Sequence, residues 1–397
     1  MFRKITGQFQ QEICPYCFDY FQIKDTPFRC SSPPATCAPA MDSKYDTVWK
    51  DPRPMGKVIP PQGTFKERFS RSARCKDCNH DSYKRLCPNC HMELPQTTGE
   101  FKNHIYAVIG GKDSGKSHYI AVLIEQIKKE IGPNMGLLLS PENDFTIERY
   151  NSEFYKPVYD DGKCIDATKS GVVDNNVKLP MVYSLRVTGE GMFDQNKIKK
   201  YITLVFFDTA GEDLESEDVM STVNKYIYRA DGIILLIDPL QLNTVTKKLP
   251  QNTPKPKVNS ATADILNRTA QLIQKGRKLK PTEKIKTPIA VAFSKFDAVL
   301  PLIDPQFQLH SGANHDKGFD ADDFEAVNSE MMSLLDQWNH QDIIQMATTR
   351  FSRFGFFGLS ALGCNPHDTT NMPSVVPRRV EAPFLWLLAQ NGTTKKV

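Results

Sequence analysis

The chain has 397 residues, of which 40% are hydrophobic and 24% are charged, and its formal net charge is +4. This composition is that of a globular protein and excludes a wholly disordered, collagen-like or coiled-coil chain. The longest apolar run, residues 232–237, is far too short to span a bilayer, and the first residues lack the apolar core of a secretory signal. We therefore expect a cytosolic protein with an accessory domain at 1–100 and a large domain at 101–397.

Cysteines are concentrated in the first 90 residues. In the reducing cytosol, clustered cysteines indicate metal binding rather than disulfides. Three pairs have C-x-x-C spacing, which lets two thiolates reach one zinc ion. Four thiolates leave no open position on the metal, so we expect two structural zinc ions. The predicted ligands are Cys14, Cys17, Cys30, Cys37, Cys75, Cys78, Cys87 and Cys90.

The pairing of these cysteines has two solutions. The run from Cys75 to Cys90 contains two C-x-x-C turns and a short spacer, which favours one site there and a second site from the four earlier cysteines. The alternative is a cross-brace, in which the two proline-containing turns at 14–17 and 87–90 share one ion. His80 and His91 are substitute ligands, although surface histidines are the simpler interpretation.

The net charge is uneven along the chain. Residues 1–102 contain 16 basic and 11 acidic residues, whereas the remainder is close to neutral. Residues 65–76 mix aromatic side chains with Arg68, Arg71 and Arg74, a combination found on surfaces that bind nucleic acids or proteins. The overall charge is too mild to indicate nucleic acid, so we favour a protein partner for this module.

After about residue 101, apolar strands alternate with amphipathic helices, which predicts an α/β fold with a parallel sheet. The strand at 104–109 runs into the pattern G-x-x-x-x-G-K-S and then into a helix. In such a loop, backbone N–H groups surround a phosphate, the lysine bridges the β- and γ-phosphates, and the serine binds Mg²⁺. The predicted phosphate-binding residues are Gly110, Gly111, Lys112, Asp113, Ser114, Gly115, Lys116 and Ser117.

A second apolar strand, at 200–207, ends in Asp208-Thr-Ala-Gly211. We expect Asp208 to bind a water molecule of the Mg²⁺ ion and the N–H of Gly211 to contact the γ-phosphate. This segment would then sense the nucleotide state. Asp238 also follows an apolar strand, but no glycine stands three residues after it. We therefore assign the magnesium role to Asp208.

A third strand, at 287–293, leads into Ser294-Lys295-Phe-Asp297. A carboxylate at Asp297 can accept hydrogen bonds from N1–H and from the 2-amino group of guanine, whereas adenine has no matching pair of donors. The stem of Lys295 would cover the base, and the backbone N–H groups of Ser360, Ala361 and Leu362 would meet guanine O6. The sequence thus predicts guanine rather than adenine.

In their order along the chain, the segments 110–117, 208–211, 294–297 and 360–362 resemble the motifs of the Ras-like (TRAFAC class) GTPases. The resemblance covers 101–391 and implies a six-stranded, mostly parallel sheet flanked by helices, with GTP, GDP and Mg²⁺ as ligands. Together with a zinc-ribbon-like module, the arrangement is more similar still to the double-GTPase family of prokaryotic conflict (antiviral defence) systems. That kinship implies protein partners, such as a second GTPase or another copy of the chain.

Two residues depart from the Ras-like pattern. Glu212 stands where the family has a glutamine that orients the attacking water, and a carboxylate can accept from water but cannot donate to the transition state. Lys112 stands where the family has glycine. We therefore expect slow, partner-stimulated hydrolysis with Lys116, Glu212 and a switch threonine as catalytic groups. The alternatives are a GTP-binding scaffold that does not hydrolyse and a nucleotide-gated nucleic-acid sensor.

The first switch is expected in an enlarged polar segment at 140–180. We choose Thr168 as its Mg²⁺-binding threonine, with Thr146 as the alternative. Two further insertions are expected as loops at 240–260 and 299–320, the second of them near Asp297.

Overall fold

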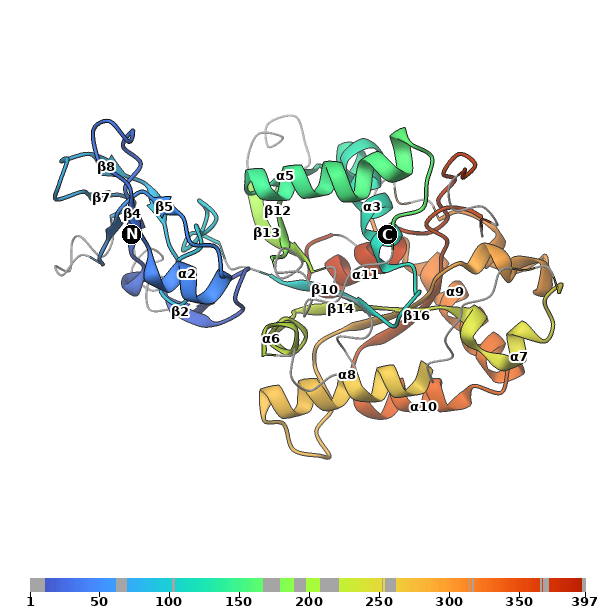
Figure 1. Ribbon diagram of the computed structural model, residues 1–397. Coiled ribbons are helices and arrows are strands. Elements are labelled where there is room, and N and C mark those ends of the chain that lie inside the picture. Colours follow the sequence, from blue (N-terminus) through green and yellow to red (C-terminus); the bar gives the residue numbers. More distant parts are fainter. Residues whose placement is uncertain are drawn as a thin grey trace. The chain divides into compact units, whose positions relative to one another are not determined.

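The computed structural model describes residues 11–61, 70–101, 104–166, 179–188, 198–207, 221–251, 253, 262–313, 315, 318–364, 366 and 371–394. They fall into two compact units (Figure 1). The first comprises Met1–His104 together with Tyr201–Thr203, and the second comprises Ile105–Lys200 and Leu204–Val397.

The first unit is built from very short strands and turns. A three-stranded antiparallel sheet has the order β6-β3-β9, and three two-stranded ribbons pair β1 with β2, β4 with β5 and β7 with β8. Strands this short cannot enclose a large apolar core, so the unit needs another source of cohesion. Its elements are β1 (Gln11–Ile13), β2 (Tyr20–Gln22), β3 (Phe28–Arg29), β4 (Ala40–Met41), α2 (Ser43–Trp49), β5 (Pro54–Met55), β6 (Val58–Ile59), β7 (Ala73–Arg74), β8 (Asp81–Ser82) and β9 (Lys84–Arg85).

A buried ionic cluster supplies part of that cohesion. Asp42 caps α2 by accepting a hydrogen bond from the N–H of Tyr45, and it also binds Arg29 Nη2 at 2.9 Å and His91 Nδ1 at 2.8 Å. Burial opposes ionisation of Asp42, but the bonds from His91, Tyr45 and Arg29 prevail and lower its pKa. The cluster thereby joins α2 to the turn that contains Cys87 and Cys90.

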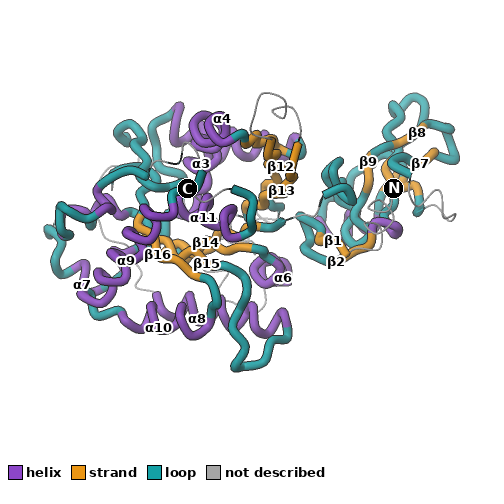
Figure 2. Tube along the Cα trace, turned by 180° about the vertical axis from the view of Figure 1, so that it is seen from behind, coloured by secondary structure: helices purple, strands orange, loops and turns teal. Residues whose placement is uncertain are grey.

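The second unit is organised around a parallel sheet of four strands. These are β10 (Tyr106–Gly110), β14 (Gly232–Ile237), β15 (Ile289–Phe293) and β16 (Phe354–Gly358), in the order β10-β14-β15-β16. Figure 2 labels β14, β15 and β16 within this sheet. Their apolar sequences suit strands that are covered on both faces. In the register, Gly110 is paired with Leu236, and Phe293 with both Ile237 and Gly358, so all four carboxyl ends meet at one edge.

Helices cover both faces of this sheet. α6 (Ser221–Arg229), α8 (Thr262–Arg277) and α10 (Gln341–Arg350) lie on one side, and α3 (Lys116–Gln126) and α11 (Ala382–Gln390) lie on the other (Figure 1). α9 (Ala321–Gln337) packs against β16, where Phe324, Phe357 and Trp386 form a cluster with ring centroids 5.3–5.9 Å apart. None of the described helices is both long and apolar enough to cross a membrane.

The expected six-stranded sheet is not formed as one sheet by the described residues. β11 (Leu137–Pro141), β12 (Met181–Thr188) and β13 (Ile198–Phe206) make a separate three-stranded sheet, in which β11 and β12 are antiparallel. The hydroxyl of Tyr226, on α6, lies between β10 and β13. It accepts from the N–H of Val108 at 3.0 Å and donates to the carbonyl of Val205 at 2.8 Å. A side chain thus provides contacts that paired strands would otherwise exchange directly.

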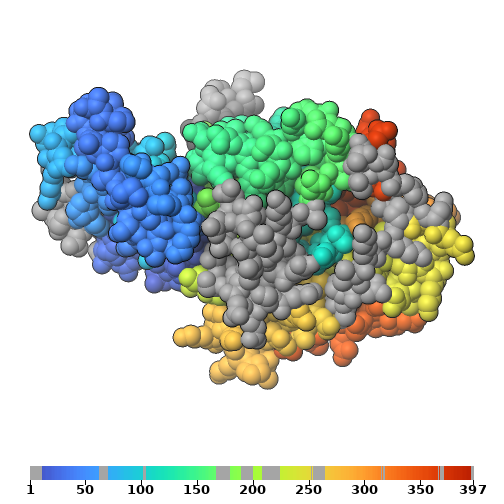
Figure 3. All heavy atoms as spheres, in the orientation of Figure 1, coloured from blue at the N-terminus to red at the C-terminus, as the bar shows by residue number. Residues whose placement is uncertain are grey.

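The segment at 140–180 is more ordered at its start than expected. After α4 (Gly132–Met135) and β11, the chain forms α5 (Asp144–Arg149) and a wide π-helix, η4 (Tyr150–Asp160). Tyr150, Phe154 and Val158 are buried, and η4 packs on α3. In Figure 3, the side chains of this segment (green) form a continuous part of the surface of the second unit. Residues 167–178 lie outside the described part.

The two expected insertions contain short turns in their described parts. The first follows Asp238 and the second follows Asp297. The first contains the end of η7 (Pro239–Gln241) and all of α7 (Asn243–Thr246), and the second contains η9 (Leu300–Leu302) and η10 (Gln308–His310). A further turn, η8 (Phe296–Ala298), directly precedes the second.

Candidate nucleotide and metal sites

The three C-x-x-C turns share one backbone conformation. The residue after the second cysteine is left-handed in each turn, with φ of 59° at Phe18, 57° at Asn79 and 54° at His91. The N–H of that residue donates to the carbonyl of the first cysteine at 2.9–3.0 Å. This tight turn brings the two sulfur atoms of each pair to the same side of the chain, as a metal knuckle requires.

The eight cysteines gather into two groups of four, and the favoured pairing is corrected. Cys14 and Cys17 group with Cys87 and Cys90, whereas Cys30, Cys37, Cys75 and Cys78 form the other group. The cross-braced alternative therefore holds, and the sequential site over 75–90 is wrong. The physical reason is that β3 pairs with β9, which places the third C-x-x-C turn beside the first.

The sulfur positions fit a tetrahedral zinc ion. Zinc–sulfur bonds of about 2.3 Å in a tetrahedron put the sulfur atoms about 3.8 Å apart. The distances are 3.8 Å for Cys14–Cys90, 3.8 Å for Cys17–Cys87 and 3.7 Å for Cys30–Cys78. Within each group, all four sulfur atoms lie within 4.8 Å of one another. Both groups are therefore able to hold zinc.

Local polar contacts suit thiolates in both groups. In the first, the N–H of Tyr16 lies 3.4 Å from Cys14 Sγ, and the N–H of Asn89 lies 3.4 Å from Cys87 Sγ. In the second, the hydroxyl of Ser32 lies 3.2 Å from Cys78 Sγ and contributes most to lowering the pKa of that thiol to about 6. Burial, in contrast, raises the pKa of Cys14, so a cation must compensate if all four sulfur atoms ionise.

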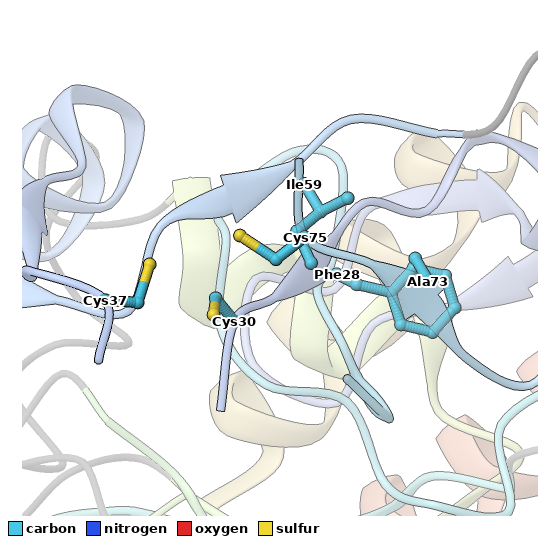
Figure 4. Packing of buried hydrophobic residues seen from close by; sticks show 6 residues of the cluster. All are labelled: Phe28, Cys30, Cys37, Ile59, Ala73 and Cys75. Atoms are coloured by element: carbon cyan, nitrogen blue, oxygen red, sulfur yellow. The ribbon is translucent and has the colours of Figure 1, made fainter. Parts of the chain in front are cut away.

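The second group also belongs to a small apolar cluster in its unit. Figure 4 shows the sulfur atoms of Cys30, Cys37 and Cys75 directed toward a common space, with Phe28, Ile59 and Ala73 packed beside them. These cysteines therefore belong both to a candidate zinc site and to an apolar cluster.

The histidine and arginine candidates of this unit have other contacts. His80 is exposed and belongs to neither cysteine group, and His91 binds Asp42. Arg71 pairs with Glu100, and Arg74 pairs with Asp81 at 3.1 Å. Arg68 lies outside the described residues. Carboxylates thus neutralise two of the three arginines that suggested a nucleic-acid surface.

In the second unit, the predicted phosphate loop connects β10 to α3. Gly115 caps the helix with φ of 76°, and Asp113 is also left-handed, with φ of 61°. A Cβ atom at Gly110 would lie 2.4 Å from Ser114 Oγ, so glycine is required there, whereas Gly115 faces open space. The loop therefore curls in a way that only small residues permit.

This loop fits a phosphate group. Lys116 is 7% exposed at the first position of α3, where the helix dipole also favours an anion. Ser114 Oγ is buried without a hydrogen-bond partner among the described residues. A buried polar atom of this kind is satisfied by a ligand or by water. Ser117 follows Lys116 on the same helical turn.

The predicted base-binding loops lie side by side at the ends of β15 and β16. The hydroxyl of Ser360 donates to Asp297 Oδ1 at 2.5 Å and accepts from the N–H of Gly363 at 2.9 Å. The N–H of Phe296 donates to the carbonyl of Leu359 at 3.0 Å. Burial raises the pKa of Asp297, and the bond from Ser360 opposes that effect. The loop of Ser360, Ala361 and Leu362 thus orients one carboxylate oxygen.

Several predicted site residues either lie outside the described part of the chain or have another role. Thr168, Asp208, Gly211 and Glu212 lie outside the described residues. The alternative switch threonine, Thr146, is completely buried, and its hydroxyl accepts from the N–H of Val182 at 3.1 Å. Thr146 therefore joins α5 to β12 and is wrong as a magnesium ligand.

The structure adds two residues that sequence reasoning missed. Asp238 binds Lys295 Nζ at 2.7 Å, and Gln241 Nε2 donates to the carbonyl of Lys112 at 2.9 Å. The signal for Asp238 is an acid at the end of a buried strand, but without the following glycine it indicates no specific role. No pattern in the sequence indicates Gln241.

No protein-family model matches the chain. A curated relative is SaeC of Mycolicibacterium smegmatis, described as a candidate ESX-1 scaffolding and assembly protein; it is 24% identical over 326 residues, which cover 77% of this chain and 80% of the relative.

Similar solved structures include the Arl6 BBS3 small GTPase of Trypanosoma brucei, at 14% identity and a TM-score of 0.30 over 73% of this chain and 98% of that one. A chain of the signal recognition particle receptor SRb-GTP/SRX complex of Chaetomium thermophilum has the same identity and TM-score, over 66% and 93%. The GTPase-like domain of Ski7 of S. cerevisiae also has 14% identity and a TM-score of 0.30, over 74% of this chain and 51% of that one. These TM-scores are too low to carry an argument about function.

Proposed function

We propose that the second unit binds guanine nucleotides with Mg²⁺ and hydrolyses GTP slowly, as a molecular switch supported by a zinc-stabilised first unit. The observation that carries the proposal is the meeting of the phosphate loop, the Asp297 loop and the Ser360 loop at one edge of the sheet. In parallel α/β sheets, ligands bind at the carboxyl ends of the strands.

Each group has a distinct role in this proposal. Asp297 accepts from guanine N1–H and the 2-amino group, and Ser360 holds it in place. Backbone N–H groups of residues 110–117 and the ammonium of Lys116 bind the phosphates. Ser117, with Asp208 and Thr168, holds Mg²⁺, which neutralises charge on the β- and γ-phosphates.

Hydrolysis is expected to be slow because Glu212 is an unsuitable group for orienting water in the transition state. A partner or a second copy would supply the missing donor. The relative from M. smegmatis is described as a scaffolding and assembly protein, which favours a second candidate: a GTP-binding scaffold without turnover. The resemblance to conflict-system GTPases is the basis for placing this switch in a multi-component defence system.

Nucleotide titration of the purified full chain tests the proposal. We expect wild type with Mg²⁺ to bind GTP more tightly than ATP, and Asp297→Ala to lose that preference while ATP binding is unchanged. Phosphate release by the chain alone should be slow. Rapid turnover would contradict the role given to Glu212, and equal affinity for GTP and ATP would contradict the guanine assignment.

A further inference from the structure

The turn that follows β14 contacts both the phosphate loop and the base-binding loop. This turn, η7, is preceded by Asp238, whose side chain is completely buried, and it ends at Gln241, which is 9% exposed. Neither residue belongs to the four sequence motifs. Both nevertheless make polar contacts with residues of those motifs.

The first contact holds Lys295. Asp238 Oδ2 lies 2.7 Å from Lys295 Nζ, and Oδ1 accepts from the N–H of Leu240 at 2.8 Å. Lys295 has a left-handed backbone, with φ of 49°, which is unfavourable for a residue with a Cβ atom. The ion pair stabilises that conformation, and the conformation directs the chain into η8, which contains Asp297.

The second contact holds the phosphate loop. Gln241 Nε2 donates to the carbonyl of Lys112 at 2.9 Å. Because a peptide group is planar and trans, fixing this carbonyl also fixes the N–H of Asp113 on the opposite side. Gln241 therefore determines the orientation of one amide in the loop that surrounds the phosphates.

Backbone contacts fasten the same turn to the base-binding side. The carbonyl of Ile237 accepts from both the N–H of Ser294, at 2.8 Å, and its hydroxyl, at 3.1 Å. The base-binding loop therefore begins from a point fixed to β14. Its next residue is then held by Asp238.

We propose that Asp238 and Gln241 are positioning residues that couple guanine recognition to phosphate binding, with Asp238 acting through Lys295 and Gln241 acting through Lys112. The inference rests on the proposed function and extends it to a segment between the motifs. Its consequence is that breaking the Asp238–Lys295 pair weakens base discrimination, whereas removing the Gln241 amide weakens phosphate binding for either base.

Dissociation constants of GTP and ATP for the full chain with Mg²⁺ test this proposal. Asp238→Asn keeps the side-chain volume and an oxygen for Leu240 but removes the charge. We expect it to weaken GTP binding roughly tenfold or more, as for loss of a charge-assisted hydrogen bond, and to weaken ATP binding less. Gln241→Leu should weaken GTP and ATP by similar factors. The control is Asp231→Asn at the opposite end of β14, where Asp231 accepts from the N–H of Ile105, and it should change neither.

A double-mutant cycle shows whether Asp238 acts through Lys295. Lys295→Met retains the apolar stem and removes the ammonium. If the two residues act through one contact, the double variant should bind GTP no less tightly than the single variant that has the larger loss of GTP affinity. Additive losses, or an unchanged GTP/ATP ratio in Asp238→Asn, would overturn the inference while leaving wild-type GTP binding intact. Absence of GTP binding by wild type would instead overturn the proposed function. If Asp238→Asn does not fold, Lys295→Met takes its place: it should weaken GTP binding more than ATP binding, whereas Gln241→Leu should weaken both by similar factors.

Discussion

At the scale of single residues, a buried ion pair fastens the C-terminal segment to α9. Arg379 donates to both oxygens of Asp323, at 2.7 Å and 2.9 Å, and to the carbonyls of Gln308 and Ser311 at 2.8 Å. Burial alone would raise the pKa of Asp323, but the bonds from Arg379 and Gln308 lower it below its ordinary value.

This pair predicts a specific pH dependence of stability. Because the pKa of Asp323 is lower in the folded state, its ionisation stabilises the fold above about pH 4, and that contribution is lost as the pH falls through the folded pKa. Asp323→Asn leaves Arg379 buried without its partner, at a cost of about 3–5 kcal/mol near neutral pH. Urea denaturation between pH 3 and pH 7 measures the difference from wild type.

The difference in free energy of unfolding between wild type and Asp323→Asn should be constant above about pH 5 and should shrink toward pH 3. Asp322→Asn is the matched control, because Asp322 is the exposed neighbour on the same helix. A gap between wild type and Asp323→Asn that stays equal from pH 7 to pH 3 would show that ionisation of Asp323 is not linked to folding.

The cysteine pairing can be tested by counting metal ions. With the cross-brace, Cys14→Ser combined with Cys87→Ser removes ligands from one site only, so bound zinc should fall from two to one per chain. Cys75→Ser combined with Cys87→Ser removes a ligand from each site and should leave none. Sequential pairing predicts the reverse. Elemental analysis of the purified proteins distinguishes the two pairing schemes. Cys164→Ser is the control and should retain two zinc ions per chain.

At the scale of elements, α6 contributes a side chain to the space between two strands. The Tyr226 hydroxyl contacts Val108 and Val205, one residue on each side of the division between the two sheets. β10 leads to the predicted phosphate loop, and β13 leads toward Asp208, so this hydroxyl contributes to the spacing of two segments that are predicted to bind the nucleotide.

Tyr226→Phe should leave the N–H of Val108 and the carbonyl of Val205 without that partner. We expect the second unit to lose about 1–3 kcal/mol of stability, the usual cost of an unsatisfied buried polar group. Hydrogen exchange at the Val108 amide should become faster. Tyr228→Phe is the control, since the Tyr228 hydroxyl makes no hydrogen bond within the described part of the chain. Unchanged exchange at Val108 would mean that the strands pair directly once the hydroxyl is removed.

The same elements show what the sequence can predict. The strand expected at 104–109 overlaps β10, and the one expected at 200–207 overlaps β13, because apolar runs with polar ends are local signals. The split between the two sheets was not predictable, since it depends on a hydroxyl from a helix 21 residues after Val205. The cysteine pairing was likewise decided by strand contacts between distant residues, and spacing alone favoured the wrong scheme.

At the scale of the whole molecule, the two units differ in what stabilises them. The first unit combines short strands with two cysteine clusters, whereas the second has an extended buried sheet covered by helices. The excess of basic residues lies within 1–102, and carboxylates pair with several of them. This distribution favours the first unit as the protein-binding part and the second as the nucleotide-binding part.

The most direct test of the guanine proposal is an exchange of base specificity. An amide in place of the Asp297 carboxylate can donate to the 2-oxo group of xanthine while its oxygen still accepts from N1–H. Titration of wild type and Asp297→Asn with GTP and XTP should therefore show wild type preferring GTP and the variant preferring XTP. If Asp297→Asn retains the wild-type preference for GTP, Asp297 does not recognise the base and the proposed site is wrong.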